Sequence, residues 1–468
     1  MTSMNSKRKT NRRTNRRSFL QQSSGIGVAF WVWGNRISAA DRSPNEKINV
    51  ACIGVAGKGN TDSNNVGELA NVVAICDIDE ERGLAKKKIQ FPQAKAYTDF
   101  RKMLDDMGSS IDAVTVSTPD HTHAAAAMMA IKMGKHVYCQ KPLTHTIHEA
   151  RAMREAAAKY KVVTQMGNQG STSDGLRRCV ELIQAGAIGS VREVHVWTNR
   201  PGWPQAPQIV ARPTEIVTVP PTVHWDLFLG PAPERPYNPC YHPKNWRGWW
   251  DFGTGALGDM GCHTANMPFM ALKLGYPTSV VAQSGEVNPE TYPSWASIQW
   301  DFPARGELPP VKFKWYEGKK IASDGAVQMN LPSADLFKGE AVPSSGSLLV
   351  GDKGTLFAPG DGDNGKNFQF KLLPEKDFAQ FEGPAPTLAR NGGSDLGQKR
   401  EWLDAIKGGP TPFSNFAYAG LLTETILLGN LAIRVGKKIE WDGPNMQATN
   451  APEAAQYISP EYRKGWSM

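Results

Sequence analysis

The sequence VTVSTPDHTHAAAAMMAIKMGKHVYCQKP, residues 114–142, predicts one βαβ unit. It begins with a short β-branched apolar run, and the turn residues STPD, 117–120, follow. An Ala/Met-rich helical segment ends at Gly134, and a second apolar run, 137–139, leads into QKP, 140–142. Because ligands bind beyond the carboxyl ends of parallel strands, the two polar clusters predict a site. The alternative is a pair of ordinary βα loops.

A glycine-rich turn follows the first predicted strand, KINVACIG, residues 47–54. The turn has the G-x-A-x-x-G pattern of a dinucleotide-binding loop, and its expected cofactor-contacting residues are Gly54, Ala56, Gly57, Lys58 and Gly59. Ala stands at position 56, where the pattern normally has a second glycine, and the neighbouring glycine is the candidate compensation.

Asp77 ends the second predicted strand, 18 residues after Gly59. A carboxylate at this place accepts a hydrogen bond from the ribose 2′-hydroxyl and repels a 2′-phosphate, so NAD is expected rather than NADP. The alternative is a glycine turn with an unrelated surface aspartate.

Alternating predicted strands and helices continue to residue 166. This predicts an α/β N-terminal domain, residues 41–166, with a Rossmann-type doubly wound parallel sheet. From 191–197 onward the strands alternate between polar and apolar residues, which is typical of antiparallel sheets. Residues 167–468 are therefore expected to form an α+β domain with a large, mostly antiparallel open sheet, which is also the expected surface for homo-oligomerisation to a dimer or tetramer.

The N-terminus has the pattern of an export signal. RRSFL, residues 16–20, resembles the twin-arginine motif, and an apolar stretch and the small residues SAA, 38–40, follow it. We expect residues 1–40 to be a signal peptide read by the twin-arginine export machinery, and a periplasmic or otherwise exported protein. The alternative is a basic tail beside an apolar patch.

The positive charge of the chain lies in this N-terminal segment. Residues 1–40 contain eight Lys and Arg and no Asp or Glu, which accounts for the whole net charge of +8. Nucleic-acid binding is therefore not expected.

No uninterrupted apolar run reaches the roughly 20 residues that span a bilayer, so no stable membrane insertion is expected. The six cysteines have no zinc-like spacing, and no metal site is expected.

Residues 197–250 are rich in tryptophan and proline. Six of the chain's 14 tryptophans lie there: Trp197, Trp203, Trp225, Trp246, Trp249 and Trp250. Flat apolar rings beside Arg247 are suited to a sugar ring, so Arg247, Trp249 and Trp250 are candidate substrate residues. The alternative is that the rings pack an irregular loop against the sheet.

Asn168 and Gln169, at the domain boundary, are further candidate substrate residues. The alternative is that residues 167–170 are a plain linker.

The tryptophan-rich stretch leads into DFGTGALGDMGCH, residues 251–263. Asp259 and His263 are four residues apart, so on a helix they share one face. In isolation, such a pair is more often a surface feature than a site.

Three of these motifs resemble one family. TPDHTHA and GKHVYCQKP resemble the TPNxxH and GKHVxxEKP signatures of the Gfo/Idh/MocA oxidoreductases, the family of glucose–fructose oxidoreductase and inositol dehydrogenase. GTGALGDMGCH resembles its third motif, GGxLxDxGxH, which supplies a catalytic Asp and His. The resemblance extends from about residue 48 to the C-terminal region, and WRGWWDFGTGALGDMGCH resembles an exported bacterial subgroup.

The resemblance implies two sets of site residues. The cofactor would contact Thr118, Pro119, Asp120, His123, Gln140 and Lys141, and the catalytic residues would be Lys141, Asp259 and His263. Two positions depart from the family pattern. Asp120 replaces the usual Asn, and Gln140 replaces a Glu that contacts the nicotinamide ribose, so that a hydrogen bond remains possible there without charge.

These observations predict an exported NAD-dependent oxidoreductase acting on a sugar or polyol. His263 is the expected proton acceptor, Asp259 would orient it, and Lys141 would stabilise the developing alkoxide, although Asp259 and His263 could exchange roles. Because the periplasm holds little free NAD, either a tightly bound NAD is re-oxidised by a second substrate, or the chemistry is redox-neutral, as in an NAD-dependent glycosidase, lyase or epimerase. A third alternative, a non-enzymatic sugar-binding protein, does not account for Lys141, Asp259 and His263 occurring together.

Overall fold

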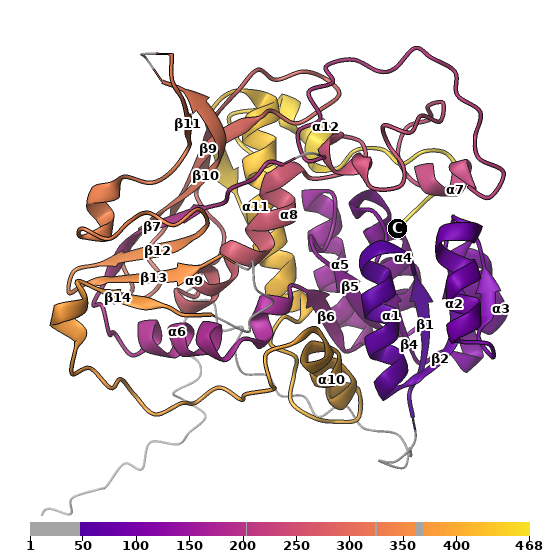
Figure 1. Ribbon diagram of the computed structural model, residues 1–468, viewed down its shortest axis with the longest axis horizontal. Coiled ribbons are helices and arrows are strands. Elements are labelled where there is room, and N and C mark those ends of the chain that lie inside the picture. Colours follow the sequence, from indigo (N-terminus) through magenta and orange to yellow (C-terminus); the bar gives the residue numbers. More distant parts are fainter. Residues whose placement is uncertain (1–46, 203, 323–324, 361–367) are drawn as a thin grey trace, which may run out of the picture. The chain divides into compact units, whose positions relative to one another are not determined.

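The computed structural model describes residues 47–468, except residues 203, 323–324 and 361–367. The predicted signal peptide, residues 1–40, therefore lies outside the described residues, and so does Trp203. Within the described part, the chain forms two sheets, each covered by helices (Figure 1).

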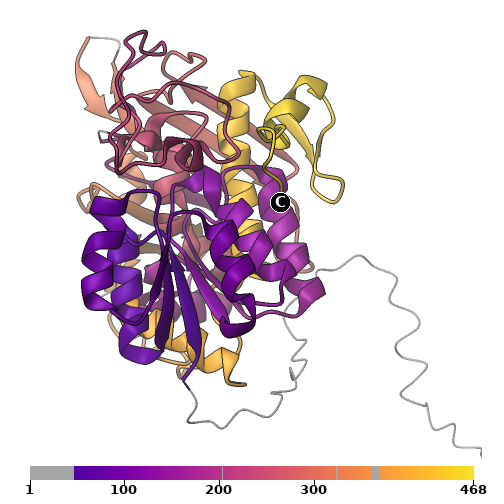
Figure 2. The ribbon, with the colours of Figure 1, turned by 90° about the vertical axis from the view of Figure 1, so that its right-hand side faces the viewer.

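The first sheet has six parallel strands in the order β3-β2-β1-β4-β5-β6. The strands are β1 (Asn49–Ile53), β2 (Asn71–Cys76), β3 (Lys95–Tyr97), β4 (Ala113–Val116), β5 (His136–Gln140) and β6 (Thr164–Gly167). Every residue of β4 is buried, because helices lie on both faces of the sheet (Figure 2). The strand order reverses between β1 and β4, and the predicted Rossmann sheet is confirmed.

Most helices of this sheet follow its strands in the chain. They are α1 (Gly57–Leu69), the π-helical turn η1 (Glu80–Ala85), α2 (Lys86–Gln90), α3 (Phe100–Met107), the 3-10 turn η2 (Gly108–Ser110), α4 (Asp120–Lys132) and α5 (Ile147–Tyr160). α5 begins with a capping box in which Thr146 and Glu149 bond to each other's backbone amides. The sequence TIHE thus fixes where this helix starts.

One helix on this sheet comes from far along the chain. α10 (Asp395–Ile406) packs against α1, and its fully buried Trp402 lies against Tyr138 of β5, with ring centroids 5.8 Å apart. On the same helix, the fully buried Lys399 Nζ donates to Asp62 Oδ1 of α1 at 2.5 Å and to the Tyr138 hydroxyl at 2.8 Å. The sequence did not predict this return of the chain to the first sheet.

The second sheet has ten strands, in the order β14-β13-β12-β7-β10-β9-β8-β15-β16, with β11 paired to β10. Of its strand pairs, β7–β10 is parallel and the others are antiparallel, so the predicted mostly antiparallel sheet is confirmed. The strands are β7 (Val191–Trp197), β8 (Ser279–Ser284), β9 (Trp295–Phe302), β10 (Val311–Ile321), β11 (Val327–Met329), β12 (Gly346–Gly351), β13 (Thr355–Pro359), β14 (Lys371–Leu373), β15 (Ile439–Asp442) and β16 (Gln447–Ala448).

Strict alternation in β9 gives this sheet its inner face. Ala296, Ile298, Trp300 and Phe302 are buried, whereas the residues between them are partly exposed.

The remaining helices and helical turns are η3 (Gln169–Thr172), α6 (Asp174–Gln184), α7 (Trp225–Leu229), η4 (Asn245–Gly248), α8 (Gly255–Thr264), α9 (Asn266–Ala271), η5 (Ala334–Phe337), η6 (Glu375–Phe378), α11 (Phe416–Val435), η7 (Pro452–Ala454) and α12 (Ala455–Ile458).

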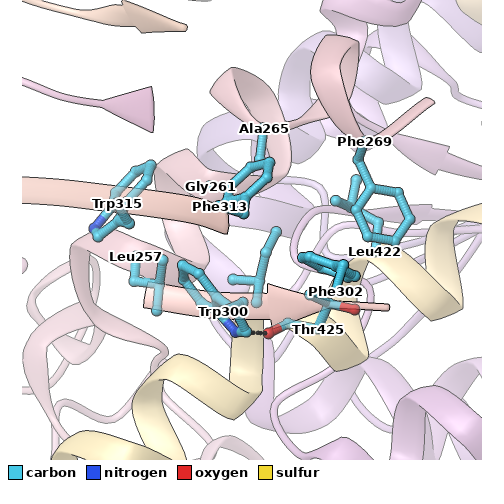
Figure 3. Close-up of a pocket in the computed structure, with 11 residues that line it drawn as sticks. Leu257, Gly261, Ala265, Phe269, Trp300, Phe302, Phe313, Trp315, Leu422 and Thr425 are labelled. Atoms are coloured by element: carbon cyan, nitrogen blue, oxygen red, sulfur yellow. Dashed lines mark hydrogen bonds between the residues drawn. The ribbon is translucent and has the colours of Figure 1, made fainter. Parts of the chain in front are cut away.

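The packing of α8 sets the direction of its polar face. Leu257, Gly261 and Ala265, spaced four residues apart, line an apolar cavity of about 10 Å³ against β9, β10 and α11 (Figure 3). A void of this size with apolar walls remains dry. It is a packing defect of the core and not a ligand site, and the opposite face of α8 carries Asp259.

α11 is long and apolar enough to cross a membrane by length and composition, and it is the one helix of the described residues that passes this test. However, 89% of its most apolar window is buried inside the protein. Its side chains pack against α5, α8 and the second sheet, so that its apolar character is satisfied within the fold.

We expect Lys399→Ala to destabilise the protein by about 3–5 kcal/mol, because the Asp62 carboxylate loses its buried partner and keeps the partly exposed Lys58 ammonium group at 3.7 Å. The measurement is the midpoint and slope of urea unfolding. The control is Lys437→Ala, which removes an ion pair to Glu453 in which both side chains are about half exposed, and which should change stability little. Equal losses for the two variants would contradict the importance assigned to the α1–α10 contact.

Candidate active site

The centre of the site is an ion pair between the two parts of the chain. Lys141 follows β5, and its Nζ donates to Asp259 Oδ1 on α8 and, at 3.0 Å, to the Asp259 carbonyl oxygen. Both side chains are more than four-fifths buried. The structure thus brings together the QKP and DMGCH motifs, which are more than 100 residues apart in the sequence.

Gln205 binds the other oxygen of the same carboxylate. Its Nε2 donates to Asp259 Oδ2 at 2.5 Å, and its Oε1 accepts a hydrogen bond from the Gly202 amide at 3.0 Å. Sequence reasoning missed this residue, because it lies in an irregular proline-rich segment without a motif. Its only signal was its position within the tryptophan- and proline-rich stretch.

The charge state of Asp259 follows from these neighbours. Burial alone would raise the pKa of its carboxyl group, but the positive charges of Lys141 and Arg247 outweigh burial and hold the pKa well below its usual range. His263, half-buried on the same helix, also lowers this pKa. Asp259 is therefore a carboxylate whose two oxygens are both hydrogen-bonded, which makes it a poor proton acceptor.

Asp120 is a second buried carboxyl group in a different environment. Thr254, at the N-cap position of α8, donates its hydroxyl to Asp120 Oδ2 at 2.7 Å. Burial raises the pKa of Asp120 to about 7, although this hydrogen bond and the charge of Arg247 lower it. Asp120 therefore ties the start of α4 to the start of α8 and titrates near neutral pH.

His123 joins the two polar clusters on which the sequence analysis began. Its Nδ1 lies 2.8 Å from the Pro142 carbonyl and its Nε2 lies 2.9 Å from the Thr118 carbonyl. Burial lowers the pKa of its imidazole to about 4, so the ring is neutral at physiological pH and donates to one of the two carbonyls. In this structure the side chain braces the loops on which the cofactor residues Thr118, Pro119 and Gln140 were predicted.

Two further histidines hold the segment that enters α8, and sequence reasoning assigned neither of them. The His121 ring nitrogens lie 2.8 Å from the Phe228 carbonyl and 3.2 Å from the Phe252 carbonyl. His145 Nε2 lies 2.9 Å from the Trp250 carbonyl. Side chains of the first domain thus position the segment that leads into α8 through its backbone carbonyls.

The glycine turn leaves room for a dinucleotide. A Cβ at Gly54 (φ +75°) would lie 2.6 Å from the Ser117 carbonyl oxygen, and one at Gly59 would lie 2.0 Å from the Gly54 carbonyl oxygen. At Gly57 (φ +50°), no heavy atom lies within 4 Å of the Cβ position. Ala56 has ordinary extended dihedrals at the N-cap, which explains why alanine is accepted there and glycine follows it.

The start of α1 is suited to a diphosphate. Its N-cap residue, Ala56, makes no side-chain hydrogen bond to the helix, and the space beside Gly57 is open, so the first-turn amides of Gly57 and Lys58 need a partner from outside the helix. The residues present therefore fit the phosphates of a dinucleotide.

Asp77 lies at this turn, at the end of β2. Its Oδ2 accepts hydrogen bonds from the Val55 amide at 2.9 Å and the Ala56 amide at 3.1 Å. Burial raises the pKa of its carboxyl group in spite of these bonds. A Cβ at Gly83 would lie 2.3 Å from Asp77 Cγ, so glycine is needed behind the carboxylate. Asp77 thus orders the turn, in addition to its predicted role at the ribose.

The structure explains why glutamine stands at position 140. Gln140 Nε2 donates to Asp62 Oδ2 at 2.8 Å, and the Ser117 hydroxyl donates to the same oxygen at 2.8 Å. A glutamate at this position would place a second carboxylate against Asp62. Asp62 and its partner Lys399 were missed, because their contact joins helices more than 300 residues apart.

Trp249 and Trp250 do not form the open stacking surface that the sequence predicted. Trp249 is fully buried against Tyr241, and its Nε1 donates to the Cys240 carbonyl at 3.0 Å. Trp250 is 3% exposed, packs against Tyr292 and donates to the Asn288 carbonyl. The prolines make this loop irregular, and the indole rings supply its core, as the alternative interpretation stated.

The other predicted substrate residues lie nearer to the ion pair. Arg247 is half-buried, stacks on Trp246 at 4.4 Å and acts electrostatically on both Asp259 and Asp120. Asn168 Nδ2 donates to the Cys262 carbonyl at 3.5 Å, and its buried Oδ1 has no hydrogen-bond partner among the described residues. Gln169 is buried at the start of η3.

No group of three His, Cys, Asp or Glu side chains within the described ranges is placed to hold a metal ion.

Comparison with protein families identifies both domains. Residues 48–168 match the profile described as "Oxidoreductase family, NAD-binding Rossmann fold", and residues 179–307 match "Oxidoreductase family, C-terminal alpha/beta domain". Both profiles describe one family, and together they cover more than half of the chain. The chain therefore belongs to the Gfo/Idh/MocA oxidoreductase family, and an NAD-binding Rossmann domain is confirmed.

Two similar curated proteins match less than a third of the chain. The inositol 2-dehydrogenase of Salmonella typhimurium is 30% identical over 149 residues, which are 30% of this chain and 44% of the relative. The levoglucosan dehydrogenase of Pseudarthrobacter phenanthrenivorans is 33% identical over 102 residues, 22% of this chain and 26% of the relative. These matches thus span less than half the length of either relative.

Solved structures share the fold over most of the chain. The aldose–aldose oxidoreductase of Caulobacter crescentus, complexed with glycerol, has a TM-score of 0.57 at 16% identity and covers 85% of this chain and 100% of its own. An inositol dehydrogenase homologue of Azotobacter vinelandii, complexed with NADH and myo-inositol, has a TM-score of 0.54 at 16% identity and covers 85% and 98%. At these identities the likeness establishes the fold.

We expect Asp120→Asn to change how stability depends on pH. The folded pKa of about 7 lies above the ordinary value of 3.8, so the wild type loses stability as pH rises through this interval, by about 1.4 kcal/mol per unit of pKa difference. The variant has no charge to bury. Its stability advantage over the wild type should therefore grow with pH up to about pH 7 and stay constant at higher pH.

The measurement is urea unfolding at pH 4 to 8. Asp105→Asn, at an exposed carboxylate of α3, is the control and should follow the wild-type curve. If the two variants have parallel curves, then Asp120 is not the buried titrating group.

Proposed function

We propose that this protein is an NAD-dependent oxidoreductase that acts on a CH–OH group of a sugar or polyol. The observation that carries the proposal is the buried Lys141–Asp259 pair, which lies where β5 ends, at the sheet edge to which β1 brings the glycine turn. Relatives named as dehydrogenases of inositol and of levoglucosan support the substrate class.

NAD, when bound, would supply the hydride acceptor. It would be held by the residues of the glycine turn, by Asp77 at its base, and by Thr118, Pro119 and Gln140 on the neighbouring loops. Asp120 was also expected to contact the cofactor, and we assign it instead to the junction between α4 and α8, because its carboxylate is bonded to Thr254.

Lys141 would bind the reacting hydroxyl. Its ammonium group carries three donors, of which the Asp259 carboxylate and carbonyl oxygens occupy two. The third is then left for the substrate oxygen, where it stabilises the alkoxide that forms as the proton leaves.

His263 would take the hydroxyl proton. Asp259 is unsuited to this role, because its low pKa and two hydrogen-bonded oxygens stabilise the charged form. The sequence had assigned Asp259 to orient His263. The contacts add a second role, in which Asp259, held by Gln205, fixes the ammonium group of Lys141, while His263 remains the expected proton acceptor.

The test is the absorbance of the purified protein before and after sugars and polyols are added. A reduced-nicotinamide band that appears and persists supports simple dehydrogenation with tightly held cofactor. A band that appears and then decays without a second substrate favours the redox-neutral alternative, a glycosidase, lyase or epimerase. Binding of a sugar with no change at the nicotinamide in any case would contradict both.

We expect Lys141→Ala and His263→Ala each to slow single-turnover reduction of bound NAD strongly while the bound NAD content stays near wild type. Loss of a transition-state charge partner costs roughly 10²–10³ in rate, and loss of an acid–base group roughly 10²–10⁴. Lys102→Ala, at an exposed lysine of the same domain, is the control.

The partner of Asp259 is tested by combining variants. If Asp259 acts through Lys141, then Asp259→Asn added to Lys141→Ala should cost little more than Lys141→Ala alone. An Asp259→Asn defect that matches His263→Ala and multiplies with Lys141→Ala would make Asp259 the base instead.

We propose that the protein is exported by the twin-arginine route, supported by the RRSFL motif at residues 16–20. Arg16→Lys combined with Arg17→Lys should leave precursor in the cytoplasm, because the machinery reads the paired guanidinium groups. Fractionation and immunoblotting measure this, with Arg12→Lys and Arg13→Lys as the control. Normal periplasmic accumulation of the first variant would exclude the route.

Homo-oligomerisation through the second sheet stays a prediction.

A further inference from the structure

A cavity of about 70 Å³ lies beside the segment 250–254 that leads into α8. Its lining residues include His145, Trp250, Tyr292, Asn430, Arg434 and Tyr457, and Ile147, Leu427 and Leu431 add apolar wall. Gln456 and Pro460, which are exposed, form its rim and connect it to solvent. At roughly 10–15 Å³ for each water, the cavity has room for about five waters or for a ligand of similar size.

Arg434 supplies a positive charge that has no counterion among the described residues. Its guanidinium carbon lies 4.8 Å from the ring centroid of Trp250 and 4.1 Å from that of Tyr457, so the group packs on two aromatic rings. Among the described residues, no carboxylate lies within ion-pair distance of Arg434 and no hydrogen bond is made by it. By contrast, the buried guanidinium groups of Arg151 and Arg177 are each paired with a glutamate.

Asn430 supplies an unused hydrogen-bond acceptor one helical turn before Arg434 on α11. Its Nδ2 donates to the Thr254 carbonyl at 3.0 Å, which fixes the orientation of the amide. Its Oδ1 is buried and has no hydrogen-bond partner among the described residues. A buried acceptor without a donor is costly, so it selects a ligand or water that can donate.

Two other polar side chains of the wall are already bonded to backbone carbonyls of the protein. The Tyr292 hydroxyl donates to the Gly253 carbonyl at 3.0 Å, and His145 Nε2 lies 2.9 Å from the Trp250 carbonyl. The cavity thus offers a ligand the donor edge of one guanidinium group and one buried amide oxygen. A planar anion with an adjacent hydroxyl matches this pair, because guanidinium binds carboxylate in a bidentate manner.

We propose that this cavity is a binding site for a small 2-hydroxy carboxylate, with its carboxylate on Arg434 and its hydroxyl donating to Asn430 Oδ1. The site is separate from the Lys141–Asp259 pair and does not depend on the proposed oxidoreductase activity. Side chains of its wall are hydrogen-bonded to the backbone carbonyl groups of residues 250, 253 and 254. A bound anion would therefore also stabilise the segment that leads into α8.

The probes are glycolate, acetate and ethylene glycol, measured by isothermal titration calorimetry on the full chain. Glycolate should bind with one site per chain and raise the thermal unfolding midpoint. Acetate lacks the hydroxyl and should bind roughly tenfold more weakly, because Asn430 Oδ1 then stays without a donor. Ethylene glycol lacks the charge and should give no signal. Equal affinities for glycolate and acetate, or no binding of glycolate at millimolar concentration, would overturn the proposal.

Variants locate the site. Arg434→Gln should abolish glycolate binding and Arg434→Lys should weaken it, because lysine keeps the charge without the bidentate edge. Arg192→Gln, at an exposed arginine of β7, makes the same charge change away from the cavity and should bind as wild type. Lys141→Ala should also bind glycolate normally.

Loss of glycolate binding in Lys141→Ala would place glycolate at the active site and refute the inference, as would unchanged binding in Arg434→Gln. If circular dichroism shows that Arg434→Gln is misfolded, Arg434→Lys decides. Unchanged affinity in that variant refutes a bidentate site, and a weakened affinity supports it.

Discussion

The Lys141–Asp259 ion pair joins the two halves of the molecule at one point. The lysine is placed by the end of β5 in the parallel sheet, and the aspartate is placed by α8, whose apolar face packs on the antiparallel sheet. Each of the two charges is buried and needs the other as a fixed partner, so the two sheets must be packed in one defined arrangement. The surrounding contacts of His121, His145 and Thr254 all serve to hold α8 in that register.

Two carboxyl groups near this pair have opposite electrostatic environments. Asp259 has Lys141 and Gln205 on its two oxygens and stays charged, whereas Asp120 is bonded to the Thr254 hydroxyl and burial raises its pKa to about 7. Environments that push the pKa values of neighbouring acids apart are typical of enzyme sites. The replacement of the family's Asn by Asp at position 120 thus introduces a titratable group at the junction of α4 and α8, and the structure gives it one fixed hydrogen bond.

The fold class could be predicted from the sequence because the patterns that indicate it lie within short segments. The glycine turn, the βαβ unit and the alternation in the later strands each depend on neighbouring residues, and all three lie where they were predicted. The catalytic candidates followed from motifs with fixed spacing, as with Asp259 and His263 on one helix. Burial was harder to predict, because the rings of Trp249 and Trp250 suited either a ligand or a loop core, and only their neighbours decide between these.

The sequence by itself determined which residues are chemically suited to the site and on which kinds of element they lie. The tertiary structure decided which of them meet. Gln205 reaches Asp259 from an irregular loop, and Lys399 reaches Asp62 from a helix that returns to the first sheet. The reason is physical: a motif records the constraints within one segment, whereas a hydrogen bond between distant segments depends on the packing of everything between them.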